Sequence, residues 1–178
     1  MSSERRQYVP IGFLSPDVFS SNLVLTIPDA TLYHFAILNS VMHNAWLRSV
    51  GGRLKSDYRY SASIVYNNFP WPDPTDAQRK AIERTGTEIL DARKQYPGST
   101  LADLYDPLTM PMELRKAHEA NDRVVDAAYK YKNAKSDPAR VAFLFGLYER
   151  LTSLLPSEGR VARKGSSRPA RPAGATKG

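Results

Sequence analysis

The chain has 178 residues, a formal net charge of +7, no cysteine and three histidines. This length allows one or two domains with a buried core. Without cysteine there is no disulfide and no thiolate metal site, and the histidines lack the spacing of a zinc motif. No apolar run approaches the ~20 residues of a membrane span, and the first residues lack a signal-peptide core. We therefore expect a cytoplasmic protein with no bound metal and no membrane partner.

The positive charge is concentrated at the C-terminus. From Pro156 onward, six Lys and Arg residues accompany a single Glu, which gives this tail +5 and leaves residues 1–155 with only +2. The tail is rich in Gly, Ser, Ala and Pro and has little apolar bulk, so we predict that it is disordered. It could make a weak, sequence-independent phosphate contact or serve as a solubilising extension, and the sequence leaves both open.

The first elements are short. Apolar runs at residues 7–14 and 22–27, separated by a Ser-Pro-Asp turn, predict two strands. A broad apolar stripe then predicts one helix from about residue 29 to Arg48, and the glycine pair at 51–52 ends it.

An alternating segment, residues 53–60, follows the glycine pair. It places charged side chains at every second position: Arg53, Lys55, Asp57 and Arg59. Successive side chains of an extended chain point to opposite faces, so a single strand would present all four on one face. Such a face mixes donors for guanine with an acceptor for the amino group of cytosine. The same alternation is typical of a solvated strand face, and the pattern alone favours that simpler interpretation.

The second half of the chain is predicted to be helical. Residues 64–66 continue the strand or form the next one, and Phe69-Pro-Trp-Pro72 makes a stiff corner. Three amphipathic segments then predict a small three-helix bundle, at residues 74–95, 112–132 and 137–154. The expected fold is α+β, with strands around one helix, then a helical domain, then the tail, at residues 1–73, 74–155 and 156–178.

Several long motifs resemble a known family, that of the MmeI-like DNA methyltransferases. These are single-chain restriction-modification enzymes of the Type IIG/IIL group that methylate adenine. The residues that resemble their target recognition domain and C-terminal helical domain are Tyr8–Pro16, Ile27–Phe35, Gly52–Ser61, Ile64–Pro72, Leu101–Pro111 and Glu113–His118. The resemblance extends from about Tyr8 to Thr152.

The motifs for chemistry in this family do not occur in the sequence. There is no Gly-x-Gly turn after an apolar strand to hold S-adenosylmethionine and no Pro-Asp…Glu-x-Lys nuclease cluster. Asn68-Phe-Pro-Trp71 has Phe69 where the adenine-gripping loop needs its first proline, so we interpret it as a structural corner. The resemblance therefore implies a C-terminal fragment that starts inside the recognition domain. It has no catalytic residue and no cofactor of its own, and S-adenosylmethionine belongs to the full-length enzyme. It could act with a separate methyltransferase chain or be a decayed gene fragment.

The resemblance also implies which residues read DNA bases. The frame Gly-Arg-x-x-x-x-Tyr-Arg-Tyr-Ser carries the role over to Lys55, Asp57 and Arg59. Family members vary at the first two positions, and the variation goes with the base pair that is read. Lys55 would donate to guanine while Asp57 accepts from cytosine, so the couple would read one G·C pair in one orientation. Arg59 is implied to pair with Asn22 or Leu23 of the earlier strand end.

Four further polar residues fit contacts to the DNA backbone or places in turns: Arg48, Arg53, Asn67 and Asn68. The implied partner is double-stranded DNA. A second function class stays open, namely a non-enzymatic helical interaction module whose basic tail binds nucleic acid without sequence preference. A free-standing enzyme has little support, because no nucleophile–base pair or metal-ligand spacing is visible.

Overall fold

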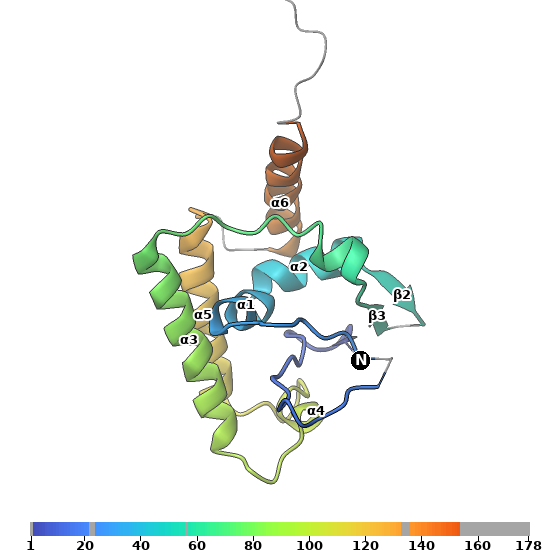
Figure 1. Ribbon diagram of the computed structural model, residues 1–178, viewed down its shortest axis with the longest axis vertical. Coiled ribbons are helices and arrows are strands. Elements are labelled where there is room, and N and C mark those ends of the chain that lie inside the picture. Colours follow the sequence, from blue (N-terminus) through green and yellow to red (C-terminus); the bar gives the residue numbers. More distant parts are fainter. Residues whose placement is uncertain (1, 22–23, 56, 133–135, 154–178) are drawn as a thin grey trace, which may run out of the picture.

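The computed structural model describes residues 2–21, 24–55, 57–132 and 136–153 of this chain (Figure 1). Its elements are β1 (Ser2–Ser3), α1 (Leu32–Leu38), α2 (Val41–Val50), β2 (Gly52–Leu54), β3 (Asp57–Arg59), a π-helix η1 (Ala62–Tyr66), α3 (Asp76–Lys94), α4 (Leu101–Leu104), α5 (Met112–Ala128) and α6 (Asp137–Thr152). The expected α+β class is confirmed. The predicted disordered tail lies outside the described residues. No helix of the described part is long and apolar enough to cross a membrane.

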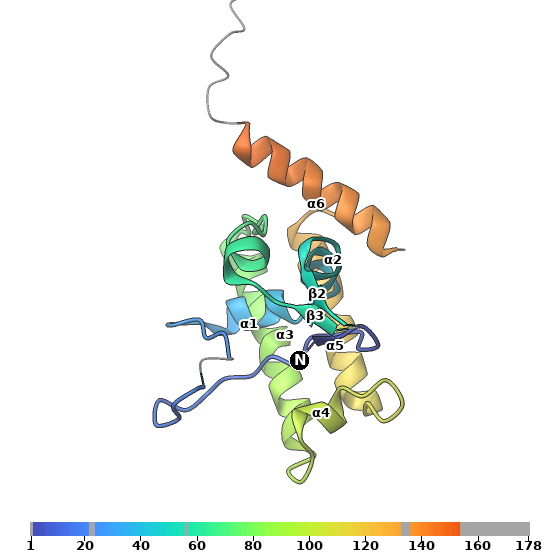
Figure 2. The same ribbon diagram turned by 90° about the vertical axis from the view of Figure 1, so that its right-hand side faces the viewer.

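Two long helices, α3 and α5, pack side by side, and the other elements are arranged around them (Figures 1 and 2). Helix α1 packs on α3, where Gly86 permits the approach, since a Cβ there would lie 3.1 Å from the carbonyl oxygen of Leu32. Helix α6 packs mainly on α2, so the three C-terminal helices are present but α6 does not join α3 and α5 in a closed bundle.

The single N-terminal helix that the apolar stripe predicts is divided in two. Asn39 ends α1, and its side-chain amide donates to the Phe35 carbonyl oxygen at 2.8 Å. Ser40 begins α2 and its hydroxyl accepts from the His43 amide at 3.3 Å. Short polar side chains offer the backbone such local partners in place of helix hydrogen bonds, and a stripe of apolar residues does not reveal the break.

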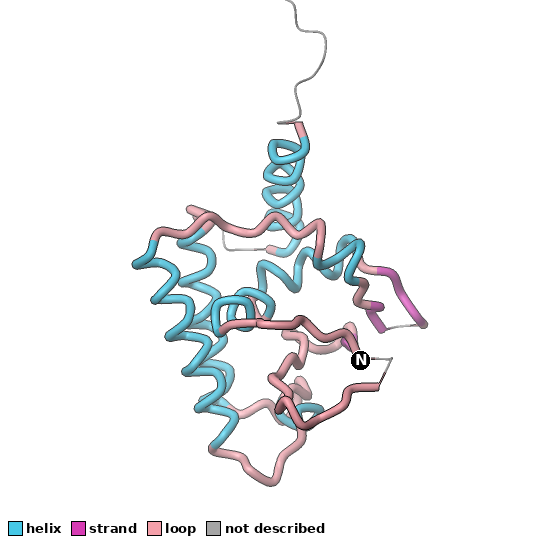
Figure 3. The backbone as a smooth tube through the Cα atoms, in the orientation of Figure 1, coloured by secondary structure: helices cyan, strands magenta, loops and turns pink. Residues whose placement is uncertain are grey.

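The strands differ most from the sequence-based expectation. Residues 7–14 and the described part of 22–27 form no strand. The predicted continuous strand at 53–60 is an antiparallel hairpin, β2 and β3, with β1 on the other side of β3 (Figure 3). Residues 64–66 belong to the π-helix, whose first turn is capped by the Ser61 hydroxyl accepting from the Ile64 amide.

The predicted corner at Phe69-Pro-Trp-Pro72 is confirmed as a structural element. Phe69 is buried, and the hydroxyls of Tyr129 and Tyr33 donate to the carbonyl oxygens of Pro70 and Pro72, at 2.8 and 3.3 Å. The corner therefore joins a core to which both halves of the chain contribute. That core also holds Trp46, whose indole N–H donates to the Val65 carbonyl oxygen at 3.0 Å.

Candidate nucleic-acid interface

The β2–β3 hairpin presents its charged residues on two faces. Leu54 pairs with Asp57 and Arg53 pairs with Tyr58. Directly opposed side chains of an antiparallel pair lie on the same face, while neighbours along a strand point to opposite faces. Asp57 and Arg59 therefore share one face of β3, and Arg53 lies on the other face with Tyr58.

Lys55 lies in the turn between the two strands. Its φ of 56° is in the left-handed region, which non-glycine residues rarely adopt. The expectation that four charged side chains line one face of a single strand is thus wrong, because the chain reverses at this residue. Two of the three predicted base readers, Asp57 and Arg59, are brought onto one face, and the third is at the hairpin tip.

The three predicted readers are available to a ligand. Lys55 and Arg59 are exposed, and Asp57 is partly exposed. Within the described ranges, no hydrogen bond or ion pair joins their side chains to another residue. A donor, an acceptor and a second donor therefore project from one short, ordered element.

Arg53 is held within the protein. Its guanidinium lies 3.0 Å from the Glu4 carboxylate, donates to the Tyr58 hydroxyl at 3.3 Å and sits over the Tyr58 ring at 4.7 Å from the ring centre. These contacts link the N-terminal turn to the hairpin. They indicate a bracing role, and a phosphate contact by Arg53 stays a prediction.

Arg48 also has structural partners. Its guanidinium contacts Asp137 at 2.5 Å and donates to the carbonyl oxygens of Arg6 and Gln7, at 3.0 and 3.1 Å. It thus fastens the start of α6 and the N-terminal segment to the end of α2.

The two predicted amides lie after the π-helix. Asn67 is its C-terminal cap, and the Asn68 amide donates to the carbonyl oxygens of Ser63 and Ile64, at 2.9 and 3.2 Å. Asn68 therefore acts as a turn residue, which is one of the two roles that the sequence left open. Asn22 and Leu23, the predicted partners of Arg59, lie outside the described residues.

The base of the hairpin is fixed by a contact with a buried histidine that the sequence did not reveal. The Tyr60 hydroxyl lies 2.9 Å from Nε2 of His43, whose ring is fully buried and packs edge-on against Phe69. Burial lowers the pKa of His43 to about 3, so the ring is neutral at physiological pH. The residue following Arg59 is thus anchored in the core while the hairpin itself is in solvent.

Comparison with known proteins identifies the chain. Residues 1–73 match the family model of the MmeI target recognition domain, and residues 74–156 match that of the MmeI C-terminal domain. The chain belongs to the MmeI family. Residues 1–156 are similar to these two domains, and the hairpin lies in the part that matches the target recognition domain.

Two relatives show how close the similarity is. Over 152 residues the chain is 47% identical to DNA methyltransferase A of Bacillus subtilis (strain 168). The aligned region covers 85% of this chain and 17% of that protein. It is 54% identical to the Type IIL restriction-modification enzyme MmeI, solved in complex with DNA, with a TM-score of 0.83 over 85% of this chain and 20% of the MmeI chain. The chain therefore spans a fifth or less of the length of these relatives.

A buried polar network joins the two MmeI-like regions, through α3, α5 and the end of α1. Arg93 of α3 donates to the carbonyl oxygen of Ile11 at 2.7 Å, to Asn39 Oδ1 at 3.3 Å and to the Tyr105 hydroxyl. The Tyr105 hydroxyl lies 2.7 Å from Nε2 of His118, whose Nδ1 lies 3.2 Å from the Asn39 carbonyl oxygen. Burial, together with the nearby Arg93 charge, lowers the pKa of His118 to about 3.

A second polar group, largely shielded from solvent, connects the N-terminal segment to α5. Asp122 accepts from the Tyr8 hydroxyl at 2.7 Å and from the Val41 amide at 2.8 Å. Burial outweighs these hydrogen bonds and raises the pKa of this carboxyl to about 6. The sequence alone does not predict these contacts, because the partners of Asp122 lie far from it along the chain.

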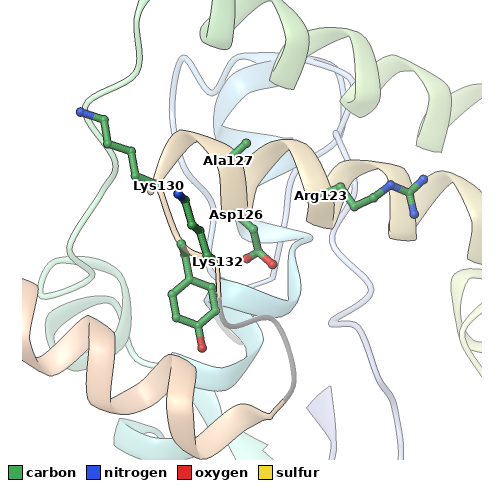
Figure 4. A pocket seen from close by; sticks show the side chains of 6 residues that line it. Arg123, Asp126, Ala127, Lys130 and Lys132 are labelled. Carbon is green, nitrogen blue, oxygen red and sulfur yellow. The ribbon is translucent and has the colours of Figure 1, made fainter.

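The C-terminal end of α5 bears an open depression of about 500 Å³ (Figure 4). It combines cations with one carboxylate and is lined by Arg123, Asp126, Ala127, Lys130, Tyr131 and Lys132. Asp126 is neutralised by Arg140 at 2.7 Å. No cluster of three potential metal ligands occurs in the part of the chain that the structure describes.

Proposed function

We propose that this chain recognises a specific DNA sequence through its β2–β3 hairpin. The observation that supports this most directly is the hairpin itself, which projects three solvent-accessible polar side chains without intramolecular side-chain partners within the described ranges. Its match to the MmeI target recognition domain and its similarity to an MmeI structure in complex with DNA agree with this role. The proposed partner is double-stranded DNA.

The proposed readout uses complementary hydrogen bonds in the major groove. Lys55 donates to O6 and N7 of a guanine, and Asp57 accepts from the amino group of the paired cytosine. A hairpin suits this geometry, because a two-stranded ribbon fits the major groove. Arg59, on the same face as Asp57, reads a neighbouring position. Each well-formed bidentate contact contributes about 1–3 kcal/mol of discrimination against a wrong base.

The DNA methylation named for the relatives would require protein segments outside the region that this chain matches. The matched region is 17% of DNA methyltransferase A, and this sequence has no motif for S-adenosylmethionine or for gripping an adenine. We propose that the methyl donor is bound outside this region, either by a longer form of the protein or by a separate methyltransferase chain. The proposed location is the cytoplasm, where such an assembly would meet cellular DNA.

The test is binding of the purified chain to a randomised duplex pool, with sequencing of the retained DNA at low and moderate salt. We expect an enriched motif that contains one fixed G·C pair and survives moderate salt. The double variant Lys55→Glu/Asp57→Arg leaves the net charge unchanged, and we expect it to prefer the opposite orientation of that pair. The matched control reverses the exposed ion pair of α3 with Asp91→Arg/Lys94→Glu, which also conserves net charge and should leave the motif unchanged.

Two results would contradict the proposal. Retention without any enriched motif, lost steeply as salt rises, would show that the basic tail is the only contact and would favour the non-specific interaction module. Equal weakening of all sequences by the Lys55/Asp57 double variant would leave these residues only a phosphate role.

A further inference from the structure

Leu54 places an apolar side chain at the end of β2, beside the left-handed turn at Lys55. The residue is 63% exposed, although it belongs to a short, ordered hairpin. In the described sheet β2 borders only β3, so the packing of the sheet does not require a leucine at this edge. A single exposed leucine is ordinary in itself. Its significance here comes from the residues that share its face.

The register of the hairpin places Leu54 on the same face as two of the proposed base readers. Leu54 pairs directly with Asp57, and Gly52 pairs with Arg59. Directly opposed side chains share a face, as do alternate residues along a strand. Leu54, Asp57 and Arg59 therefore form one surface, here called the reading face, and Gly52 adds no side chain opposite Arg59. In a continuous strand Leu54 and Asp57 would point to opposite faces, so the reversal at Lys55 brings them together.

The other face of the hairpin is turned toward the protein. Tyr58 packs, partly buried, against the core cluster that contains Trp46. The guanidinium of Arg53 lies over the Tyr58 ring and contacts the Glu4 carboxylate. The hairpin itself lies at the edge of the molecule, away from α3 and α5 (Figure 1). The reading face therefore presents Leu54 to solvent together with two polar groups proposed to meet base edges.

The major groove of DNA offers one apolar feature to such a side chain. Every base pair displays hydrogen-bonding groups there, but only thymine adds a methyl group, at C5. A leucine neither donates nor accepts hydrogen bonds, so this methyl group is its chemical complement in the groove. Opposed side chains of a hairpin lie about 5 Å apart, and successive base pairs about 3.4 Å apart. The contact of Leu54 therefore falls within about two base pairs of the pair that Asp57 reads.

We propose that Leu54 is a specificity-determining residue that contacts the C5-methyl group of a thymine. It selects a T·A pair within about two base pairs of the G·C pair read by Lys55 and Asp57. This inference rests on the proposed base reading by the hairpin and adds a contact of different chemistry to it. The polar readers distinguish bases by their donors and acceptors, whereas Leu54 distinguishes thymine from uracil, which pairs with adenine in the same way.

The test uses duplexes that carry the motif enriched by the purified chain from the randomised pool. Each thymine of the motif is replaced in turn by deoxyuridine, which removes only the methyl group. We expect the affinity to fall about fourfold at one thymine near the fixed G·C pair, as for exposing one methyl-sized group to water, with little change at other thymines. The pool contains only unmodified bases, so an enriched thymine, and not 5-methylcytosine, is the source of the methyl group.

Variants of Leu54 assign the effect to this side chain. Leu54→Ala should bind the thymine and deoxyuridine duplexes equally, and it should fold normally because the side chain is exposed. Leu54→Met keeps a long apolar side chain and should retain the preference for thymine. Leu108→Ala is the matched control, because Leu108 is 94% exposed but lies in the loop between α4 and α5. It should keep the full ratio between the two duplexes.

Three outcomes would overturn the inference, and they separate it from the proposed function. An enriched motif with a fixed G·C pair but no effect of deoxyuridine would remove the methyl contact and leave the polar readout standing. An effect of deoxyuridine that persists in Leu54→Ala would assign the methyl group to another residue, again without affecting the polar readout. The absence of any enriched motif would contradict both proposals, because there would be no base reading for Leu54 to extend.

Discussion

The buried polar network around Arg93 and the exposed hairpin around Lys55 use similar chemical groups for opposite purposes. In the network, each donor and acceptor meets a partner inside the protein, as when Arg93 reaches Ile11, Asn39 and Tyr105. In the hairpin, within the described ranges, the side chains of Lys55, Asp57 and Arg59 have no such partner. Burial makes a missing partner costly, whereas water supplies one at the surface at little cost.

This difference separates stability from recognition. A substitution in the network should change folding and leave sequence preference alone, provided the protein still folds. A substitution in the hairpin should do the reverse. Four predictions test the contrast.

The largest effect is expected from Arg93→Met. This change keeps an unbranched apolar stem but removes donors to three acceptors, two of them buried, so we expect a loss of about 3 kcal/mol in the free energy of unfolding. Urea unfolding measures the loss. Lys94→Met, one position along α3, removes an exposed ion pair and should change stability by less than ~0.5 kcal/mol. Equal effects at both positions would show that the network does not stabilise the fold.

The next effect is a loss of stability in acid. His43 and His118 have a pKa of about 3 in the folded protein and about 6.5 when unfolded. As pH falls below 6.5, these two rings therefore gain protons in the unfolded chain but stay neutral in the folded protein. Each histidine then disfavours folding by on the order of 2 kcal/mol at pH 5. Asp122 acts in the opposite direction, because its pKa of about 6 favours the folded state as pH falls toward 4.

The two histidines outweigh this one carboxyl, so we expect a net loss on the order of 2 kcal/mol between pH 7 and pH 5. Urea unfolding at pH 7, 6 and 5 measures it. His118→Gln should be less stable at pH 7 but should flatten the pH dependence, which identifies the titrating group. A stability that rises toward pH 5 would contradict the assignment of neutral buried rings.

The sequence predicts the elements whose signals are local. The Phe69-Pro-Trp-Pro72 corner follows from prolines that restrict their own backbone, and α3 follows from its Thr75 cap and apolar stripe. Residues 7–14 and 22–27 are predicted to be strands, but a strand needs a neighbour that the pattern of one segment does not specify. The alternation at 53–60 likewise conceals a reversal, because nothing at Lys55 identifies it as a left-handed residue.

The candidate site was predictable from the family motif in its residue types but not in its geometry. Sequence reasoning placed Arg53 on the same face as Asp57, whereas the hairpin register places it opposite, with Tyr58. The supports of the site, such as His43 beneath Tyr60, are separated from it by many residues. Only tertiary packing brings them together, so no local pattern could indicate them.

An intermediate effect on stability is expected from Arg48→Met. This variant separates a structural role from a DNA contact at a residue that the sequence predicts to contact the DNA backbone. The change removes an ion pair with Asp137 and bonds to two carbonyl oxygens, so we expect a loss of about 1–2 kcal/mol in the free energy of unfolding. The measurement is urea unfolding together with the salt dependence of DNA binding. Unchanged stability with a salt slope reduced by about one would instead assign Arg48 to a phosphate.

The smallest effect is expected at the hairpin tip. Lys55→Gly removes a side chain from a left-handed backbone conformation, which favours the folded state, but it also makes the unfolded chain more flexible, which opposes folding. We therefore expect the free energy of unfolding to rise by less than ~1 kcal/mol. The enriched DNA motif should nevertheless lose its preference for one G·C pair. Lys130 provides the control, because it has the same φ of 56° at the end of α5, outside the hairpin. Lys130→Gly should change the urea midpoint in the same direction and leave the motif intact. If both variants alter the motif equally, Lys55 acts through charge alone, and the hairpin does not read bases by this side chain.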